Sequence, residues 1–374
     1  MRLAVPKETR AGETRVAATP ESVKKFKSLG LEVVVQAGAG AAARVSDADY
    51  TAAGATIAPD AAGTLKDADI VLKVRGVESG EISQIKKGAV LAALLSPHAE
   101  KDAIAALASQ GVTAFAMELL PRISRAQAMD VLSSQANLAG YKAVIDSAGA
   151  FGRAFPMMMT AAGTITAAKA FIMGVGVAGL QAIATARRLG AVVSATDVRS
   201  ATKEQIESLG AKPIFVESVA GIEGEGAGGY ATEMSPEYQK AQAELVSAHI
   251  AKQDIVITTA LIPGRAAPRL INDAQIASMK PGSVIFDLAV AQGGNVEGSR
   301  PDEVVIKHGV KIIGYTNTPA HLPADASALF SRNLFNFLSA FWDKEAGKPV
   351  LDEEIGDAIR LTRDGKVVNE RLLG

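Results

Sequence analysis

Short apolar runs alternate along the chain with longer stretches in which apolar residues recur at helical spacing. In the first third, the apolar runs predict strands at Arg2–Val5, Leu31–Val35, Ala68–Val74, Ala89–Leu95 and Val112–Met117. Helices are predicted from Pro20 with Thr19 as N-cap, over Ser46–Ala53 with a serine cap, and over Glu100–Gln110. Strands that alternate with helices predict a parallel, doubly wound sheet.

A second series of strands follows a helix-rich stretch at about residues 127–150. Its strands are predicted at Ala170–Met173, Ala191–Asp197, Pro213–Val216, Asp254–Thr259, Ser283–Leu288 and Lys311–Tyr315. The apolar helix Ala326–Phe341 is expected to return to the first domain, because the second sheet is complete before it. We therefore predict an α/β protein with two Rossmann-like, doubly wound parallel-sheet domains flanking a cleft. The first domain is expected over residues 1–130 plus about 320–374, and the second over about 131–319.

A glycine motif with the spacing G-x-G-x-x-G lies between the first strand and the first helix of the second domain. Gly174 would permit a tight turn, Gly176 would let the backbone approach a pyrophosphate, and Gly179 would let helix and strand pack closely. The helix that starts near Val177 would offer free N–H groups and a positive dipole end to the phosphates. The strand, turn, helix and strand context predicts a dinucleotide site rather than an unliganded glycine turn.

An acidic residue ends the next strand, at the spacing expected for a ribose ligand. Asp197 lies about 20 residues past the glycines, where a carboxylate accepts hydrogen bonds from the ribose hydroxyls. The same charge opposes a 2′-phosphate, so the sequence favours NAD(H) over NADP(H). Arg199 weakens this inference slightly, because a nearby arginine can accommodate that phosphate.

Composition and charge exclude several classes of protein. The 374 residues are 48% hydrophobic, and a net charge of −1 gives no electrostatic footprint for nucleic acid. There is no cysteine, which excludes disulfides, thiolate catalysis and cysteine-ligated metal. The four histidines show no metal-ligand spacing, so no metal site is predicted. The N-terminus is too polar for a signal peptide, and no apolar run reaches about 18 residues, so a cytoplasmic protein without a membrane span is expected.

Three further segments could carry chemistry. Residues 120–135 follow a strand end and hold many groups that fix amides and hydroxyls, although a capped helix start with solvated charges is an equal alternative. Residues 217–234 contain many glycines and are interpreted as a lid over the nucleotide, with a disordered insertion as the alternative. Residues 258–264 end a strand beside the nucleotide and would border the adenosine or ribose, unless they form an ordinary strand exit.

These segments together resemble the NAD(H)-binding component, domain I, of proton-translocating nicotinamide nucleotide transhydrogenase. The resemblance covers about residues 1–343 and leaves the tail after Lys344 unmatched. It is most specific in residues 121–141, 155–164, 174–191, 196–199, 228–231 with 234, and 259–264.

The resemblance implies a set of site residues. A polar loop would hold the nicotinamide and its ribose for hydride transfer through Gln127, Arg122, Asp130 and Ser133. Nucleotide contacts are implied for Gly174, Gly176, Val177, Gly179, Asp197, Val198, Arg199, Gly229, Tyr230, Met234 and Leu261. The resemblance also implies a homodimer that transfers hydride from bound NADH to NADP⁺ on a partner NADP(H)-binding domain. Membrane-spanning subunits would couple this transfer to proton translocation and place the chain peripherally on the cytoplasmic side of the inner membrane.

Alanine dehydrogenase resembles the same pattern and is the main alternative. Oxidation of an amine releases a proton and needs a general base, whereas hydride exchange between two nicotinamides can proceed by positioning alone. The catalytic His and Asp of that enzyme fall at Leu95 and Ala291 in this chain, which argues for the transhydrogenase. A non-catalytic NAD-sensing module is a third possibility, and the polar loop at the expected nicotinamide position argues against it.

Overall fold

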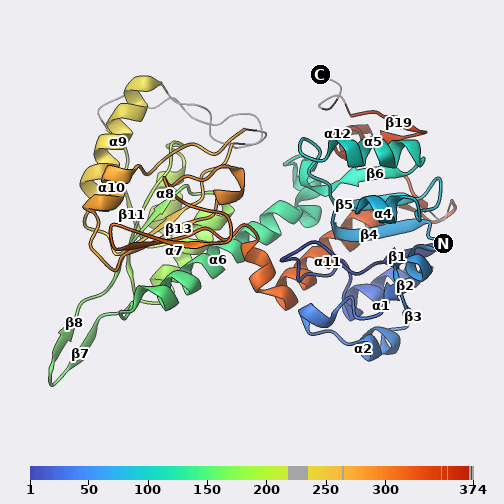
Figure 1. The fold of residues 1–374 in the computed structure, drawn as a ribbon, viewed down its shortest axis with the longest axis horizontal. Helices are drawn as coiled ribbons and strands as arrows, with labels where there is room; N and C mark the ends of the chain where they lie inside the picture. Colours follow the sequence, from blue (N-terminus) through green and yellow to red (C-terminus); the bar gives the residue numbers. More distant parts are fainter. Residues whose placement is uncertain (218–234, 263–264, 347, 352, 370–371, 373–374) are drawn as a thin grey trace. The chain divides into compact units, whose positions relative to one another are not determined.

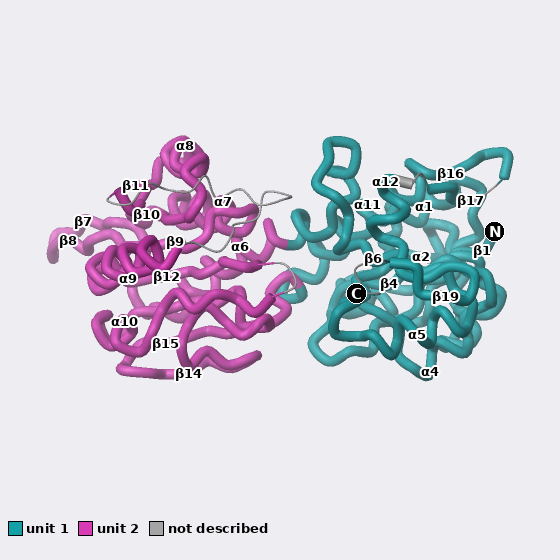
Figure 2. The backbone as a smooth tube through the Cα atoms, turned by 90° about the horizontal axis from the view of Figure 1, so that it is seen from above, with its two compact units in different colours: residues 1–135, 320–374 teal, residues 136–319 magenta. Residues whose placement is uncertain are grey.

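The chain folds into two compact units. The structure is a computed structural model that describes residues 1–217, 235–262, 265–346, 348–351, 353–369 and 372. Unit 1 comprises residues 1–135 and 320–374, and unit 2 comprises residues 136–319 (Figure 2). The chain passes from unit 1 to unit 2 within helix α6 (Val131–Phe151) and returns within the short helix η5 (Thr318–His321).

Unit 1 is built on a six-stranded parallel sheet. Its strands are β1 (Arg2–Val5), β2 (Glu32–Gln36), β3 (Thr56–Ala58), β4 (Ile70–Arg75), β5 (Val90–Leu94) and β6 (Thr113–Ala116). They lie in the order β3-β2-β1-β4-β5-β6, and every pair is parallel. The predicted doubly wound sheet is thereby confirmed, with its reversal of strand order between β1 and β4.

Helices cover the unit 1 sheet, and two of them begin at the caps that the sequence predicts. They are α1 (Pro20–Ser28), η1 (Ala41–Ala43), α2 (Asp47–Ala52), α3 (Ala61–Leu65), α4 (Ser79–Ile82), α5 (Lys101–Ser109), η2 (Met117–Leu119) and η3 (Ser124–Met129). The Thr19 hydroxyl accepts from the backbone N–H of Ser22, and the Ser46 hydroxyl accepts from that of Asp49. Each cap satisfies a backbone donor that the first helical turn leaves unpaired.

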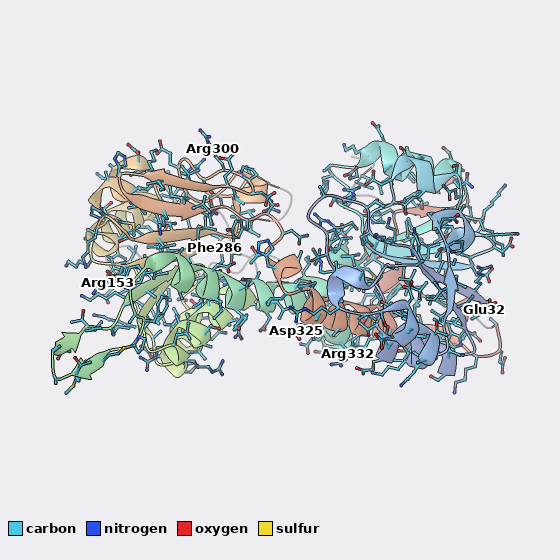
Figure 3. All side chains as sticks on the ribbon, turned by 60° about the horizontal axis from the view of Figure 1, so that its bottom comes forward. Glu32, Arg153, Phe286, Arg300, Asp325 and Arg332 are labelled. Atoms are coloured by element: carbon cyan, nitrogen blue, oxygen red, sulfur yellow. The ribbon has the colours of Figure 1, made fainter. Side chains whose placement is uncertain are left out.

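Helix α11 (Pro323–Ala340) supplies much of the unit 1 core. Phe330 and Phe337 are fully buried, and the Phe337 ring meets the ring of Phe115 in β6 edge to face at 5.7 Å. Charged side chains such as Asp325 and Arg332 are exposed (Figure 3). This division of apolar and charged residues explains why a helix late in the sequence packs with elements from its beginning.

The C-terminal tail continues the first unit. It contains β16 (Trp342–Asp343), β17 (Lys348–Pro349), α12 (Glu353–Ile359), β18 (Thr362–Arg363) and β19 (Lys366–Val367). The Thr362 hydroxyl donates to the Val112 carbonyl at 2.7 Å and accepts from the Ala114 N–H at 3.0 Å, while the Leu361 N–H donates to the Ala114 carbonyl at 2.8 Å. The tail therefore covers backbone groups that edge strand β6 would otherwise expose.

Unit 2 repeats the parallel topology and adds an antiparallel edge. Its strands lie in the order β11-β10-β9-β12-β13-β15-β14, and only the β14–β15 pair among them is antiparallel. The strands are β9 (Lys169–Met173), β10 (Val192–Thr196), β11 (Lys212–Pro213), β12 (Ile255–Thr258), β13 (Val284–Asp287), β14 (Val304–Lys307) and β15 (Val310–Ile313). The helices are α6, α7 (Val177–Arg188), α8 (Thr202–Ser208), α9 (Pro236–Ile250), α10 (Asp273–Ser278) and η4 (Val290–Gln292).

Two strands of this sheet differ from the sequence prediction. The strand predicted at Pro213–Val216 is the two-residue β11 (Lys212–Pro213), which pairs with β10 at the edge of the sheet. Strand β14 was not predicted; a two-residue turn joins it to β15, with positive φ angles of 52° at His308 and 78° at Gly309. Both differences lie at the sheet edges, where burial imposes the weakest pattern.

A two-stranded hairpin extends from unit 2 (Figure 1). Its strands β7 (Met158–Thr160) and β8 (Gly163–Ile165) pair only with each other in the described structure. Met157, Met159 and Ile165 are 63%, 78% and 42% exposed. A hairpin this short is marginally stable alone, and its apolar side chains have no covering element within the described residues of their own chain.

Candidate functional site

The glycine motif forms a tight connection from β9 to α7. Gly174 has φ +98°, a conformation that L side chains avoid, and a Cβ there would lie 2.5 Å from the Thr259 hydroxyl oxygen. Gly176 precedes the first residue of α7, and a Cβ on it would meet no described atom within 4 Å. Among the described residues, no atom thus occupies the position of a residue 176 side chain beside the N-terminus of α7, where a helix favours an anion.

Two further glycines allow the close packing that fixes this connection. A Cβ on Gly179 would lie 1.9 Å from the carbonyl oxygen of Gly174, so the first turn of α7 presses on the glycine turn. A Cβ on Gly140 would lie 2.0 Å from the carbonyl oxygen of Ala178, so α6 packs on that same helical turn. Backbone rather than side chains forms both contacts, and only glycine fits at either position.

Buried polar groups hold the segment after β12 against the glycine turn. The Thr259 hydroxyl donates to the Gly174 carbonyl at 3.0 Å. The fully buried Asn295 side chain accepts from the Ala260 N–H at 3.1 Å and donates to the Ala260 carbonyl at 2.9 Å. The Asn295 N–H in turn donates at 3.2 Å to the buried Asp287 carboxylate at the end of β13. The segment after β12, which lies beside the glycine turn, is thus held by side chains that the sequence analysis did not include among the site residues.

The Asp197 carboxylate is buried at the end of β10 and accepts four hydrogen bonds. One oxygen accepts from the Arg199 backbone N–H at 2.9 Å and from its Nε at 2.8 Å. The other accepts from the Val175 N–H at 2.7 Å and from Arg199 Nη2 at 2.9 Å. A carboxylate offers about four acceptor positions, so protein donors fill all of them in this conformation.

These partners determine the charge of Asp197. Burial opposes ionisation, but the hydrogen bonds from Arg199 and Val175 outweigh it and lower the pKa of Asp197 below its ordinary value. Burial raises the pKa of the buried Tyr238, and the charge of Asp197 raises it further. Tyr238 in α9 is therefore a neutral hydroxyl close to this acid.

The other residues implied for the nucleotide have varied surroundings. Val177 and Val198 are half-buried beside the motif, and Leu261 is 39% exposed after β12. Gly229, Tyr230 and Met234 lie outside the described residues, as does almost all of the segment interpreted as a lid.

The polar loop of residues 122–133 belongs to unit 1. Asp130 caps helix α6, because its carboxylate accepts from the Ser133 N–H at 2.9 Å and from the Ser133 hydroxyl at 2.5 Å. Arg122 and Gln127 are exposed, and Gln127 lies in the short helix η3. The structure brings Asp130 and Ser133 into direct contact and leaves the Gln127 amide on the surface.

Helix α11 holds this loop in place. The Ala128 carbonyl accepts from the side-chain amides of Asn333 and Asn336, each at 2.9 Å. On either side of Gln127, Ala126 and Met129 are buried in the unit 1 core. The exposed Gln127 therefore stands between two buried anchors, with its backbone fixed by a helix about 200 residues later in the chain.

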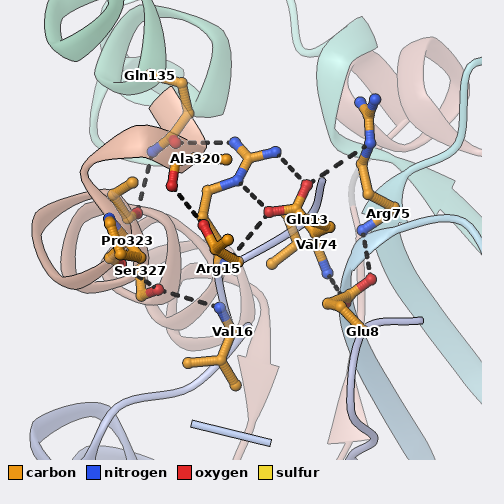
Figure 4. Close-up of polar contacts among 12 residues, drawn as sticks. Glu8, Glu13, Arg15, Val16, Val74, Arg75, Gln135, Ala320, Pro323 and Ser327 are labelled. Atoms are coloured by element: carbon orange, nitrogen blue, oxygen red, sulfur yellow. Dashed lines mark hydrogen bonds and ion pairs between the residues drawn. The ribbon is translucent and has the colours of Figure 1, made fainter. Parts of the chain in front are cut away.

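A buried ion pair fixes the N-terminal segment to the start of α6 and to α11 (Figure 4). The Arg15 guanidinium donates to Glu13 through Nε at 2.8 Å and Nη2 at 2.7 Å, and through Nη1 to the Gln135 side chain at 2.9 Å. The Val16 N–H donates to the Ser327 hydroxyl at 3.0 Å. Both charged side chains are nearly inaccessible to solvent, so this cluster has a structural role in unit 1.

The two positions to which the resemblance assigns the acid–base groups of alanine dehydrogenase hold apolar side chains. Leu95 is buried in an apolar cluster, and Ala291 is exposed in η4. His98 is exposed three residues after Leu95, where the loop passes through Ser96 with φ +49°. The Glu118 carboxylate holds this loop, because it accepts from the backbone N–H of Leu95 at 2.8 Å and from that of Ser96.

Two other histidines, His249 and His308, have structural surroundings. His249 shares a hydrogen bond of 2.8 Å with the Ser194 hydroxyl and packs its ring edge on Phe171, and burial lowers its pKa. His308 contacts Asp273 at 2.7 Å on the surface. No group of His, Asp and Glu side chains among the described residues could hold a metal ion. Within those same residues, no helix is both long enough and apolar enough to cross a bilayer.

Comparison with known families matches both halves of the chain. The family model described as "Alanine dehydrogenase/PNT, N-terminal domain" matches residues 4–139, and its C-terminal counterpart matches residues 143–370. The second match extends through most of the tail, which the resemblance in the sequence had left unassigned. The tail is thus a regular component of this family's fold.

Individual relatives cover the whole chain. The first segment of the alpha subunit of NAD(P) transhydrogenase from Rhodospirillum rubrum is 56% identical over 381 aligned positions, covering 100% of this chain and 99% of the relative. A solved transhydrogenase structure from Sinorhizobium meliloti is 52% identical with a TM-score of 0.87, covering 99% of this chain and 100% of that one. Alanine dehydrogenase of Mycobacterium tuberculosis is 30% identical, covering 86% of this chain and 82% of the relative.

Proposed function

The chain belongs to the alanine dehydrogenase/PNT family, and we propose that it is the NAD(H)-binding component of a proton-translocating nicotinamide nucleotide transhydrogenase. NADH bound to this chain supplies a hydride to NADP⁺ held on a partner domain. The 56% identity to a transhydrogenase subunit, against 30% to an alanine dehydrogenase, supports this choice within the family.

Unit 2 supplies the residues suited to the dinucleotide. The first N–H groups of α7 and the open space at Gly176 suit a pyrophosphate, because a Cβ at that position would enter the space that the phosphates need. Asp197 lies where an adenosine ribose is expected, and its negative charge favours NAD(H) over NADP(H). The Thr259–Leu261 segment, fixed by Asn295, borders the same turn.

Unit 1 supplies the polar loop that would position the nicotinamide. Asp130 and Ser133 form a rigid cap, and the Gln127 amide can donate and accept hydrogen bonds without changing its charge. Arg122 is exposed in the same loop. Transfer of a hydride between two nicotinamides requires no proton transfer at the reacting carbons, so an uncharged positioning residue is chemically sufficient.

The observation that carries the proposal is the chemistry of Leu95 and Ala291, the two positions to which the resemblance assigns the acid–base groups of alanine dehydrogenase. A dehydrogenase of amino acids needs a group that removes a proton, and neither Leu95 nor Ala291 can do so. This chain therefore keeps the features suited to a dinucleotide and lacks the acid–base pair for a small substrate.

The proposed assembly has three components. Two copies of this chain form a homodimer, a separate domain binds NADP(H), and membrane-spanning subunits couple hydride transfer to proton translocation. The name of the Rhodospirillum rubrum relative, a segment of an alpha subunit, supports the existence of other subunits. The chain would then lie on the cytoplasmic side of the inner membrane through these partners.

Substrate specificity tests the proposal against its alternative. The purified chain is expected to bind NADH, measured by the change in its fluorescence, and to reduce no NAD⁺ when L-alanine is added. NAD⁺ reduction at rates typical of dehydrogenases would establish the alternative function. NADH binding without any transfer to an added NADP(H)-binding domain would favour a sensing module.

A further inference from the structure

Arg199 holds the Asp197 carboxylate with two parallel side-chain donors. Its Nε and Nη2 donate to different oxygens of the carboxylate, at 2.8 Å and 2.9 Å. Both side chains are largely withdrawn from solvent, with 16% of Arg199 and 6% of Asp197 exposed. This is the bidentate, charge-assisted geometry in which an arginine binds a carboxylate most firmly.

A vicinal diol could make the same pair of hydrogen bonds. The two hydroxyls of an adenosine ribose can each donate one hydrogen bond to one oxygen of an acid. In the structure, the other two acceptor positions of Asp197 are taken by the backbone N–H groups of Val175 and Arg199. Those backbone bonds do not depend on the Arg199 side chain, so the carboxylate would stay in place if the guanidinium left.

We propose that the Arg199 guanidinium occupies the acceptor positions of the ribose diol and that a bound dinucleotide must displace it. The inference rests on the proposed NAD(H) function and deepens it, because it makes Arg199 a specificity-determining residue. Only a ligand with both ribose hydroxyls replaces both bonds that the guanidinium gives up. A ligand with a 2′-phosphate replaces at most one and brings its charge to the acid.

The substitution Arg199→Met separates this role from a direct ligand contact. Methionine removes both side-chain donors but keeps the backbone N–H that bonds to Asp197. Because no internal competitor then remains, NADH should bind about tenfold more tightly than to the native chain, the effect expected for loss of a charge-assisted pair. NADPH should bind more weakly, because the uncompensated carboxylate repels its 2′-phosphate. The two affinities are thus expected to change in opposite directions.

Isothermal titration calorimetry with NADH and NADPH measures both affinities on the full chain. Arg188→Met is the matched control. Arg188 is exposed in the last turn of α7, so this substitution removes the same charge from the same unit away from Asp197. That control should change both affinities by less than about twofold. The melting temperature of ligand-free Arg199→Met should fall, because Asp197 loses its ion pair, while saturating NADH should raise it more than in the native chain.

Each other outcome overturns the inference. Weaker or unchanged NADH binding by Arg199→Met would mean that Arg199 contacts the ligand or stays paired with Asp197. If Arg199→Met does not fold, Arg199→Lys keeps the charge with a single donor group, and it should still bind NADH more tightly than the native chain. Failure of the native chain itself to bind NADH would overturn the proposed function together with the inference.

Discussion

At the scale of single residues, Gln127 is expected to affect the rate of hydride transfer much more than the affinity for NADH. Its amide is exposed between the buried Ala126 and Met129, so a change there should leave the loop folded. Gln127→Asn retracts the amide by one methylene. Because misplacement by about 1 Å can slow hydride transfer about 100-fold, we expect a large loss of rate to NADP⁺ on a partner domain, with NADH affinity within a few-fold of native.

Single-turnover kinetics and NADH titration measure these two effects separately. Gln84→Asn is the control, because it is the same shortening at an exposed site of unit 1, where the Gln84 amide bonds the nearby Gly80 carbonyl. Equal losses of rate and affinity in Gln127→Asn would make Gln127 an ordinary binding residue.

Glu8 makes the stability of unit 1 depend on pH. Burial, opposed in part by Lys73 and by the hydrogen bond from the Val74 N–H, raises the pKa of Glu8 from 4.5 to about 7. The folded chain thus binds more protons here than the unfolded chain between pH 4.5 and 7, and the stability contributed by the protonated acid is lost as the pH rises through that range.

The variant Glu8→Gln should remove this pH dependence, because glutamine resembles the protonated acid. Urea denaturation measures the free energy of unfolding of both proteins at each pH. The difference between them, variant minus native, should increase by about 3 kcal/mol from about pH 4.5 to about pH 8. The same slope of stability against pH in both proteins would mean that Glu8 is ionised in the folded state.

At the scale of elements, the contact between α6 and α7 sets the glycine turn. The Gly140→Ala substitution would place a Cβ 2.0 Å from the Ala178 carbonyl oxygen, so the two helices must separate. We expect a loss of stability of about 2 kcal/mol and NADH binding weaker by about tenfold or more, since α7 carries the phosphate-binding N–H groups.

The same helix provides the control. Gly149 is exposed in α6, and a Cβ there would meet no described atom within 4 Å. Gly149→Ala should therefore leave NADH affinity unchanged and stabilise the chain by up to about 1 kcal/mol through helix propensity. If both variants lose NADH affinity equally, the α6–α7 contact has no specific role at the glycine turn.

Local patterns were sufficient for the central strands of both sheets and for the glycine turn. Strand β1 and the caps at Thr19 and Ser46 lie where the sequence predicts them, because apolar runs and capping residues act over a few positions. The short β11 was mispredicted and the edge strands β3 and β14 were missed, because an edge strand carries little burial pattern.

The supports of the candidate site could not be predicted in this way. Asn295 fixes Ala260 from 35 positions away, and Asn333 fixes Ala128 from 205 positions away. Buried asparagines need hydrogen-bond partners, but both their burial and the identity of those partners depend on tertiary structure. The filling of the Asp197 carboxylate by donors of Arg199 and by the Val175 N–H is likewise a matter of tertiary geometry that a motif does not contain.

At the scale of the whole molecule, the exposed hairpin of unit 2 suits the proposed homodimer. Met157 and Met159 lie on one face of the hairpin, and Met158 and Ile165 lie on the other. All four side chains are exposed, so another chain could cover an apolar face here. The double substitution Met157→Asp with Met159→Asp should convert a dimer to a monomer at micromolar concentration, measured by sedimentation equilibrium. Ile306→Asp is the control, because Ile306 is 69% exposed on β14 of the same unit. A dimer that survives the hairpin change would place the subunit contact elsewhere.

The central claim concerns one reaction, direct hydride transfer between two nicotinamides. The most direct measurement mixes this chain with an NADP(H)-binding transhydrogenase domain, NADH labelled with deuterium at the transferable position, and NADP⁺, and follows the label by mass spectrometry. We expect the deuterium to appear in NADPH without exchange with water, and only when both proteins are present, because the reaction passes a hydride and no proton. Unlabelled NADPH, or no NADPH despite saturated binding of both nucleotides, would contradict the account.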